Sequence, residues 1–346
     1  MPVYLLNSDM ERLIEMFKKI LIANLNRKYA GKELMFCERV YGDICFYPYS
    51  IQQCCFCTKV PYSPPLLFLK KLKNFSFFQY IKNVDRIMSA NQKSKSPCGG
   101  CKFLKKQQVP KFPDENNITF LTINHFTKCN SNCVYCAIGR KTEDIKYKLL
   151  PMVKQMIKSK MISKECLINW GGGEPTMCSE FEDIAEYFKK NGIRQAVNSS
   201  GIIFSPIIWD GLKDGSMSIQ ISPDSGTEET YLKIKRQNNF NKVWENIGKY
   251  AVYPDMLFVK YIFFSMSANE NDVRKFIDKC VQSGVKNIVI DCESNSANNP
   301  HSPFGRINEE ILKLAVLMKH LAEENGIKYQ ISYQWRSEHK KFIEEN

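Results

Sequence analysis

The sequence predicts an α/β protein in which a partial (β/α)6 barrel of parallel strands follows a smaller cysteine-rich region. Three observations carry this prediction. From residue 118 onward, β-branched apolar segments alternate with amphipathic helical ones, as in parallel sheets. The strand segments are almost continuously hydrophobic, as expected when both faces are buried. Six strand–helix units are fewer than the eight of a closed barrel, so we expect an open one. The expected boundaries are 1–117 and 118–346.

The individual elements follow in order along the second region. A helix is expected between each pair of strands, and the helix at 179–190 has Ser179 as a candidate N-cap. Gly326 closes the last long helix, and the first 36 residues are expected to be mostly one helix. The expected strands are 118–124, 166–170, 193–198, 216–222, 256–264, 285–291 and a trailing strand at 327–333.

Unusual loops follow four of these strands. The first strand leads into KCNSNCVYC, the second into GGGEPT (171–176), the third into SSG (199–201) and the fourth into PDSG (223–226). In parallel sheets, ligands bind at the carboxyl ends of the strands. Four such loops on one rim therefore predict a site there.

The first loop holds Cys129, Cys133 and Cys136, spaced C-x3-C-x2-C. A structural zinc site uses four protein ligands, whereas three thiolates on a [4Fe–4S] cluster leave one iron open for another ligand. The alternative is a structural zinc or a redox cluster that takes a fourth cysteine from elsewhere in the chain.

The segment 129–136, with Tyr135 before the third cysteine, resembles the signature of the radical S-adenosylmethionine (SAM) superfamily. The resemblance covers roughly residues 118–334. It implies that Cys129, Cys133 and Cys136 bind a [4Fe–4S] cluster, that the open iron binds SAM, and that Tyr135 lies beside the adenine through its backbone. It also implies that a deoxyadenosyl radical, formed by reductive cleavage of SAM, abstracts a hydrogen atom from the substrate.

The other loops supply the remaining expected SAM contacts. In the family a GGEP segment runs along the methionine part of SAM. Glycines allow close backbone approach, and a carboxylate can accept hydrogen bonds from an ammonium group. The matching residues here are Gly172, Gly173, Glu174 and Pro175.

Three further positions are weaker candidates for SAM contacts. Ser200 stands where relatives often have T-N-G, so its role departs from the pattern. Ser222 and Asp224 resemble the S-x-D-S-G of many members, although Asp224 could instead cap the next helix. Lys260 is a charge within an apolar strand, and it either pairs with the SAM carboxylate or lies exposed at an edge.

Substrate-side residues are expected at the last strand ends. A radical reaction can use a hydrogen donor such as Cys292 or a base such as Asp291 or Glu293, and His301 follows in the same loop. The alternative is that all four are ordinary loop residues.

The N-terminal region carries its own cysteines. Cys37, one of Cys54 and Cys55, Cys98 and Cys101 make a four-thiolate set that resembles a SPASM-type auxiliary cluster region moved ahead of the barrel. The alternatives are a zinc site built from Cys55, Cys57, Cys98 and Cys101, or simply buried thiols. The cysteines that look like ordinary core residues are Cys45, Cys166, Cys178 and Cys280.

Composition limits the cellular setting. The chain has 14 cysteines, a formal charge of +13 and a pI near 9.0, and its start lacks the order of a signal peptide. We therefore expect a cytoplasmic protein with reduced, metal-bound thiols, no membrane span and a flavodoxin- or ferredoxin-type electron donor. The lysines are scattered, so a nucleic-acid partner is not expected.

Together these features predict a radical SAM enzyme, an oxidoreductase or isomerase, that oxidises or epimerises a small or carrier-linked metabolite such as a sugar derivative. An enzyme that modifies peptides is the alternative, but the N-terminal 36 residues are short for a peptide-recognition module. A third hypothesis, from another class of function, is a non-catalytic iron–sulfur or zinc protein that binds nucleic acid. The GGGEPT segment argues against this hypothesis because it matches a SAM-binding loop.

Overall fold

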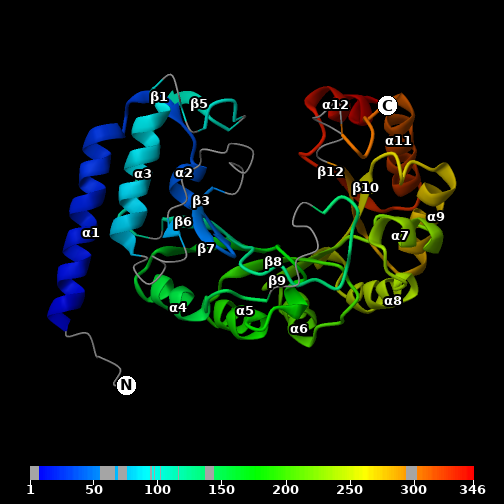
Figure 1. Cartoon of the computed structure of the whole chain (residues 1–346), viewed down its shortest axis with the longest axis horizontal. Coiled ribbons are helices and arrows are strands. Elements are labelled where there is room, and N and C mark those ends of the chain that lie inside the picture. Colours follow the sequence, from blue (N-terminus) through cyan, green and yellow to red (C-terminus); the bar gives the residue numbers. More distant parts are fainter. Residues whose placement is uncertain are drawn as a thin grey trace. The chain divides into compact units, whose positions relative to one another are not determined.

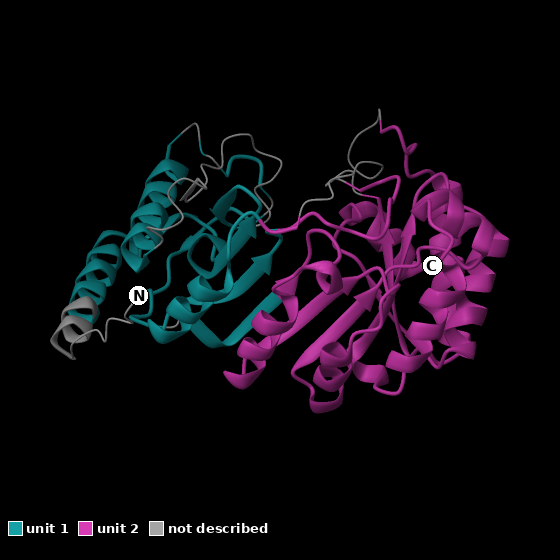
Figure 2. Ribbon diagram, turned by 60° about the horizontal axis from the view of Figure 1, so that its bottom comes forward, with its two compact units in different colours: residues 1–125, 146–168 teal, residues 126–145, 169–346 magenta. Residues whose placement is uncertain are grey.

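A computed structural model of the chain describes residues 8–54, 67–68, 76–93, 96, 98–101, 103–115, 117–136, 144–293 and 302–346. It divides into two compact units (Figure 2). Unit 1 comprises residues 1–125 and 146–168, and unit 2 comprises residues 126–145 and 169–346. The boundary expected at residue 117 stays a prediction.

Unit 1 contains two sheets and two long helices, α1 (Ser8–Tyr29) and α3 (Phe77–Asn91). One sheet pairs β1 (Glu33–Phe36) with β5 (Lys105–Gln108) in antiparallel fashion. In the other, the strand order is β7-β6-β2-β3-β4. The members of this second sheet are β2 (Asp43–Tyr47), β3 (Ser50–Gln53), β4 (Leu67–Phe68), β6 (Ile118–Ile123) and β7 (Ile162–Trp170).

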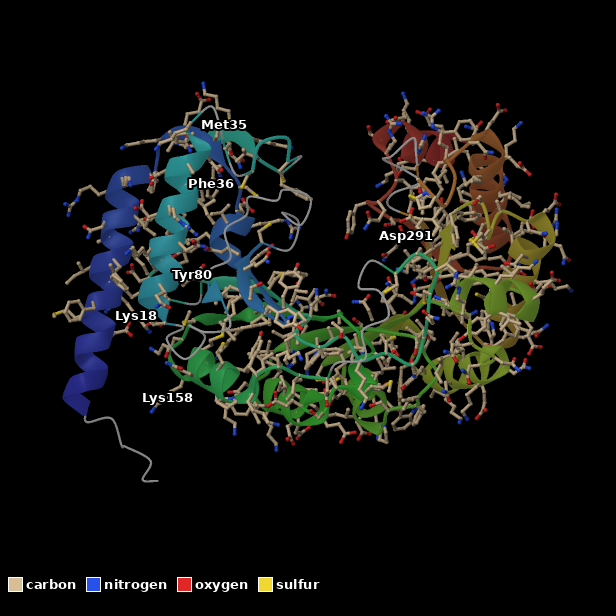
Figure 3. The ribbon with its side chains drawn as sticks, viewed as in Figure 1. Lys18, Met35, Phe36, Tyr80, Lys158 and Asp291 are labelled. Carbon is tan, nitrogen blue, oxygen red and sulfur yellow. The ribbon has the colours of Figure 1, made fainter. Side chains whose placement is uncertain are left out.

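The cysteine-rich segment therefore forms strands of its own, which the sequence pattern did not predict. The short helix α2 (Arg39–Gly42) leads into β2, which runs parallel to β6 and antiparallel to β3. Phe36 and Tyr80, both labelled in Figure 3, are buried in this unit at 1% and 0% exposure. Helix α4 (Leu150–Lys158) precedes β7. Of the cysteines expected to bind a second cluster or a zinc ion, Cys37, Cys54 and Cys98 are buried, Cys101 is half-buried and Cys55 lies outside the described residues.

Unit 2 contains the parallel sheet that carries the site. Its strand order is β12-β11-β10-β9-β8, and each pair of neighbouring strands runs parallel. The carboxyl ends of these strands therefore lie at one edge. The strands are β8 (Arg194–Ser199), β9 (Met217–Ile221), β10 (Leu257–Phe263), β11 (Asn287–Cys292) and β12 (Lys328–Ile331).

Helices cover one face of this sheet (Figure 1). Gln195 in β8 donates to the Ala185 carbonyl of α5 at 2.9 Å, and Tyr261 in β10 donates to Asp272 of α9 at 2.8 Å. Because side chains alternate along a strand, Asn198 and Lys260 point to the other face, called here the helix-free face. The helices are α5 (Phe181–Lys190), α6 (Pro206–Asp214), α7 (Glu228–Lys235), α8 (Phe240–Tyr250), α9 (Glu270–Gln282), α11 (Glu309–Glu324) and α12 (Ser337–Glu345).

The predicted α/β fold with an open, partial barrel of parallel strands is confirmed. Within the described residues every expected strand has a counterpart, and the additions are the helices α2, α3, α7 and α12 and the strands β1–β5. Two expected caps differ. Thr227, rather than Asp224, caps α7 by accepting the Thr230 N–H, and α5 begins after Glu180 rather than after Ser179, without a side-chain cap. No described helix is long and apolar enough to span a membrane.

Candidate SAM and iron–sulfur site

The three-cysteine loop lies in unit 2 at the rim of a cavity of about 180 Å³. The pKa of the Cys129 thiol is raised to about 11, mainly by burial and also by the nearby charges of Glu174, Cys133 and Cys136, while the Ser131 N–H lowers it. The three thiols and the Glu174 carboxylate therefore lie within electrostatic reach of one another. Residues that line the cavity include Cys129, Cys133, Cys136, Gly172, Gly173 and Arg236.

Helix α7 fixes the middle of this loop. The Asn132 N–H donates to the Lys235 carbonyl at 3.1 Å, and the Val134 N–H donates to the Ile234 carbonyl at 3.0 Å. These two bonds flank Cys133 on both sides. Because the last carbonyls of a helix lack partners within the helix, the end of α7 is well suited to hold a loop in this way.

The GGGEP loop packs directly against the start of the cysteine loop. The Gly173 N–H donates to the Phe126 carbonyl at 3.2 Å, and the Glu174 N–H donates to the Lys128 carbonyl at 2.9 Å. A Cβ on Gly173 would lie 2.1 Å from the Lys128 oxygen, so only glycine fits. Gly172 has φ of +81°, which also favours glycine.

Glu174 joins the GGGEPT loop to the SSG loop through its carboxylate. Its side chain is 1% exposed. Oε1 accepts the Thr176 and Ser199 hydroxyls, both at 2.9 Å, and Oε2 accepts the Ser200 N–H at 2.7 Å. Since a carboxylate oxygen has two lone pairs, Oε2 can accept one more donor, which leaves room for the predicted ammonium contact. Pro175, buried, begins the short 3-10 helix that follows.

Buried polar groups near this loop lack protein partners. The Ser200 hydroxyl donates to Asn130 Oδ1 at 2.9 Å, while the Asn130 amide nitrogen and the Ser131 hydroxyl are buried without a hydrogen bond in the described structure. Buried polar groups are normally paired. These two therefore fit a site that binds a polar molecule.

Asp224, Lys235 and Tyr135 form a buried network beside Cys133. Asp224 Oδ2 accepts from Lys235 and from the Tyr135 hydroxyl, and Lys235 donates to that hydroxyl at 2.7 Å. Burial lowers the pKa of Lys235, but the charges of Asp224 and Cys133 raise it by more. Lys235 is therefore a cation close to a predicted cluster ligand.

Within this network, Asp224 Oδ1 is buried without a hydrogen bond in the described structure, and the residue adopts φ of +55°. The Tyr135 ring packs on Phe264 at 5.7 Å. Ser222, at the end of β9, is half-buried.

The substrate-side candidates separate into two groups. Lys260 Nζ lies 3.5 Å from Asp291 Oδ2, and Asp291, labelled in Figure 3, also accepts the Cys292 N–H at 2.9 Å. Both side chains belong to the helix-free face. Glu293 is 5% exposed and follows β11. Cys292 is 2% exposed and, by strand alternation, points away from Asp291. His301 lies outside the described residues.

The thiol set fits a cluster with three protein ligands. Among the described residues, no three Cys, His, Asp or Glu side chains surround one point closely enough to hold a single metal ion. The loop instead presents three thiols at the edge of an open cavity, which suits a larger group whose fourth ligand is a small molecule. The contributions of Lys235, Arg236, Asn130 and Ser131 were not predicted from sequence, although KIKR at 233–236 is a basic run that could have indicated them.

An open parallel barrel with this loop at its strand ends defines a class of iron–sulfur domains that bind SAM. The profile of the radical SAM superfamily matches residues 123–279 of the chain. Residues 123–279 therefore form a radical SAM domain, and the cofactors of such a domain are a [4Fe–4S] cluster and SAM.

Relatives agree with this assignment. A probable GTP 3′,8-cyclase of Methanococcus maripaludis is 27% identical over 193 residues, 54% of this chain and 64% of the relative. A GTP 3′,8-cyclase of Clostridium botulinum is 28% identical over 138 residues, 38% of this chain and 43% of the relative. The chain thus spans less than two-thirds of the length of these relatives.

Two solved structures share the fold. SuiB of Streptococcus suis bound to the precursor peptide SuiA has a TM-score of 0.51 at 9% identity, covering 75% of this chain and 54% of SuiB. Native anSMEcpe with bound AdoMet has a TM-score of 0.50 at 17% identity, covering 62% and 63%. At these identities the likeness concerns the fold alone.

Proposed function

We propose that this radical SAM enzyme abstracts a hydrogen atom from a small or carrier-linked, hydroxyl-rich metabolite such as a sugar derivative, and oxidises or epimerises it. The observation that carries the proposal is a row of polar side chains on the helix-free face of unit 2. Cys129, Cys133 and Cys136 would hold the cluster. Glu174, with the glycines before it, would hold the methionine part of SAM.

The polar row runs across three strands. The Asn198 amide donates to Asn169 Oδ1 at 3.0 Å, and its Oδ1 accepts from Gln220 at 3.0 Å. All three side chains are half-buried. The Asn169 amide nitrogen and Gln220 Oε1 make no hydrogen bond within the described structure, so the row has an open donor at one end and an open acceptor at the other. Hydroxyl groups can satisfy both.

Charge on the same face favours a substrate of low net charge. Lys260 is paired with Asp291 at 3.5 Å, and the acidic Glu293 follows on the same strand end. Binding a triphosphate requires several cationic side chains to balance its charge. On the described part of this face Lys260 is already paired with the Asp291 carboxylate, which leaves it less able to bind a phosphate. This argues for a sugar derivative over GTP, the substrate in the names of the relatives.

The expected chemistry is a single hydrogen abstraction. When bound, SAM at the cluster would supply a 5′-deoxyadenosyl radical that takes a hydrogen atom from a substrate C–H and becomes 5′-deoxyadenosine. For oxidation, the substrate radical would give one electron to the [4Fe–4S] cluster, oxidised by the cleavage of SAM, and one proton to Asp291 or Glu293. For epimerisation, it would regain a hydrogen atom on its other face from a thiol, whose thiyl radical the electron donor would reduce.

A flavodoxin- or ferredoxin-type protein is the proposed electron donor, and the cytoplasm the proposed compartment. Peptide modification remains the second candidate because one structure of the same fold holds a peptide. The sequence identity to that structure is only 9%, so peptide modification ranks below the sugar derivative.

Deuterium transfer tests the substrate class. The cluster-loaded enzyme is incubated anaerobically with SAM, a strong reductant and one of three candidates that carry carbon-bound deuterium: sugar derivatives of low net charge, GTP or short peptides. We expect 5′-deoxyadenosine one mass unit heavier with a sugar derivative. Deuterium arriving only from GTP or from a peptide would replace the proposal by that substrate.

A variant pair ties this result to the polar row. We expect Gln220→Leu to lose the substrate-stimulated part of SAM cleavage and to keep the basal part. The control is Gln330→Leu, an exposed glutamine on β12 of the same unit, which should change neither. Equal behaviour of the two variants would remove the row from substrate binding.

A further inference from the structure

Asp272, in the first turn of α9, is a buried carboxylate with no part in the SAM contacts described above. Its side chain is 1% exposed. Oδ2 accepts the Gly226 N–H at 3.0 Å and the Tyr261 hydroxyl at 2.8 Å. Oδ1 accepts the Thr227 N–H at 3.0 Å and the Thr227 hydroxyl at 2.6 Å. A carboxylate has roughly four lone-pair positions, so these donors use its full capacity.

The place of Asp272 in α9 would ordinarily give its side chain a different partner. Asn269 caps this helix by accepting the Asp272 N–H at 3.1 Å. An acidic side chain at this position commonly reaches back to the N–H of the capping residue. Here the Asn269 N–H donates to the Ser267 carbonyl at 2.9 Å. The Asp272 carboxylate is therefore free to bind the loop between β9 and α7 instead.

The loop between β9 and α7 lies directly against α9. A Cβ on Gly226 would lie 2.1 Å from the Phe276 nitrogen and 2.2 Å from the Asp272 carbonyl oxygen, so only glycine fits. The Thr227 hydroxyl donates to Asp272 and also accepts an N–H of the first turn of α7 at 3.3 Å, which caps that helix. Asp272 therefore holds both the loop that carries Asp224 and the start of α7.

Helix α7 connects this anchor to the cysteine loop. It has 8 residues, which corresponds to a length of about 12 Å. At its far end two carbonyls accept the N–H groups of Asn132 and Val134, on either side of Cys133. Because the turns of a helix are hydrogen-bonded to one another, a shift at the start of α7 moves the backbone around Cys133 as well.

We infer that Asp272 is a positioning residue for the SAM site, which holds Cys133 in place through α7 rather than by contact with it. The bonds from Lys235 and Tyr135 to Asp224 join the same loop to the same helix and to the cysteine loop. The anchored loop, α7 and the cysteine loop therefore move as one piece. This role is independent of the substrate.

Hydrogen exchange tests this role in the full chain, purified anaerobically with its cluster and kept without substrate. In Asp272→Asn, whichever oxygen becomes the amide nitrogen, two donors lose their acceptor. We expect the peptide that contains Asn132 and Val134 to exchange at least about tenfold faster, because a hydrogen bond to a charged group is worth about that factor or more. Exchange at the wild-type rate would overturn the inference.

The control is Asn287→Ala, which removes a buried bond of 2.7 Å to the Pro254 carbonyl at the amino ends of β10 and β11. It should leave exchange around Cys133 unchanged, and equal acceleration in both variants would show general loosening and overturn the inference. The EPR spectrum of the reduced cluster with SAM should change in Asp272→Asn and stay as in wild type in Asn287→Ala. An unchanged spectrum in Asp272→Asn would show that the thiolates keep their place and would also overturn the inference.

A second pair of variants decides the matter if Asp272→Asn does not fold. Thr227→Val removes the hydroxyl that donates to Asp272, whereas Thr227→Ser keeps it. We expect faster exchange around Cys133 in Thr227→Val and the wild-type rate in Thr227→Ser. Equal exchange in the two variants would refute the role of Asp272. Turnover is not measured, so failure here is distinct from failure of the proposed function.

Discussion

Replacing Gly173 by alanine is the sharpest test of how the SAM site is built. The added Cβ would lie 2.1 Å from the Lys128 oxygen and 2.7 Å from the Thr127 carbonyl carbon. Both are backbone atoms, so no side-chain rotation can relieve the overlap. The cysteine loop and the GGGEP loop must separate.

The size of this separation follows from the geometry. Ordinary van der Waals contact begins at 3.4 Å, so the Lys128 oxygen must move about 1.3 Å away from the new Cβ. This movement breaks the two hydrogen bonds that join the loops, at 3.2 Å from the Gly173 N–H and at 2.9 Å from the Glu174 N–H. Losing two such hydrogen bonds costs about 2 kcal/mol, and overpacking adds about 1–3 kcal/mol. Because Cys129 follows Lys128 directly, and a 1 Å misplacement can cost about 100-fold in rate, we expect 5′-deoxyadenosine formation to fall at least 100-fold.

The assay compares Gly173→Ala with Gly248→Ala. Gly248 lies within α8, and a Cβ there meets nothing within 4 Å, so its replacement should be neutral or should stabilise the helix by up to about 1 kcal/mol. Iron content, SAM affinity and 5′-deoxyadenosine are measured for both variants. Wild-type SAM cleavage by Gly173→Ala would refute the close approach of the two loops.

Three further predictions concern individual charges and ligands. Cys133→Ala should abolish 5′-deoxyadenosine formation under a strong reductant, and persisting turnover would contradict its role as a ligand. Glu174→Ala should weaken SAM binding, measured by calorimetry on cluster-loaded protein, and should lower the free energy of unfolding by about 2–6 kcal/mol because buried donors lose their acceptor; an unchanged SAM affinity would exclude Glu174 from the site. Lys235→Met should lower the cluster's midpoint potential and Asp224→Asn should raise it, each on the order of 50–100 mV for a unit charge several ångströms away at an effective dielectric constant of about 20. Shifts of the same sign in an EPR-monitored titration, or an equal shift for the exposed Lys233→Met, would show a merely structural role.

The predicted strands could be recognised because their cause is local. A strand buried on both faces is mostly apolar, as in β10, and β11 is buried at every residue. Strands β8, β9 and β12 instead alternate in burial from one residue to the next, which is also a local signal for a strand. The loops at the strand ends could also be recognised from the sequence, because their cysteines, glycines and acidic residues are unusual for the short connections expected in such sheets. The short strands β2 and β3 lacked this signal because cysteine, glutamine and tyrosine residues interrupt their apolar pattern, and β4 has only two residues.

The sequence by itself determined the chemistry of this protein. Cys129, Cys133 and Cys136, together with GGGEP, were sufficient to predict a cluster and SAM because ligand types and their spacing are local properties. The tertiary structure alone decided which distant residues serve that site. Lys235 meets Asp224 and Cys133 only because α7 returns to the cysteine loop, and Glu174 binds Ser199 and Ser200 only because two strand ends lie on one rim. Such pairings depend on contacts between segments far apart in the chain, which no local pattern encodes.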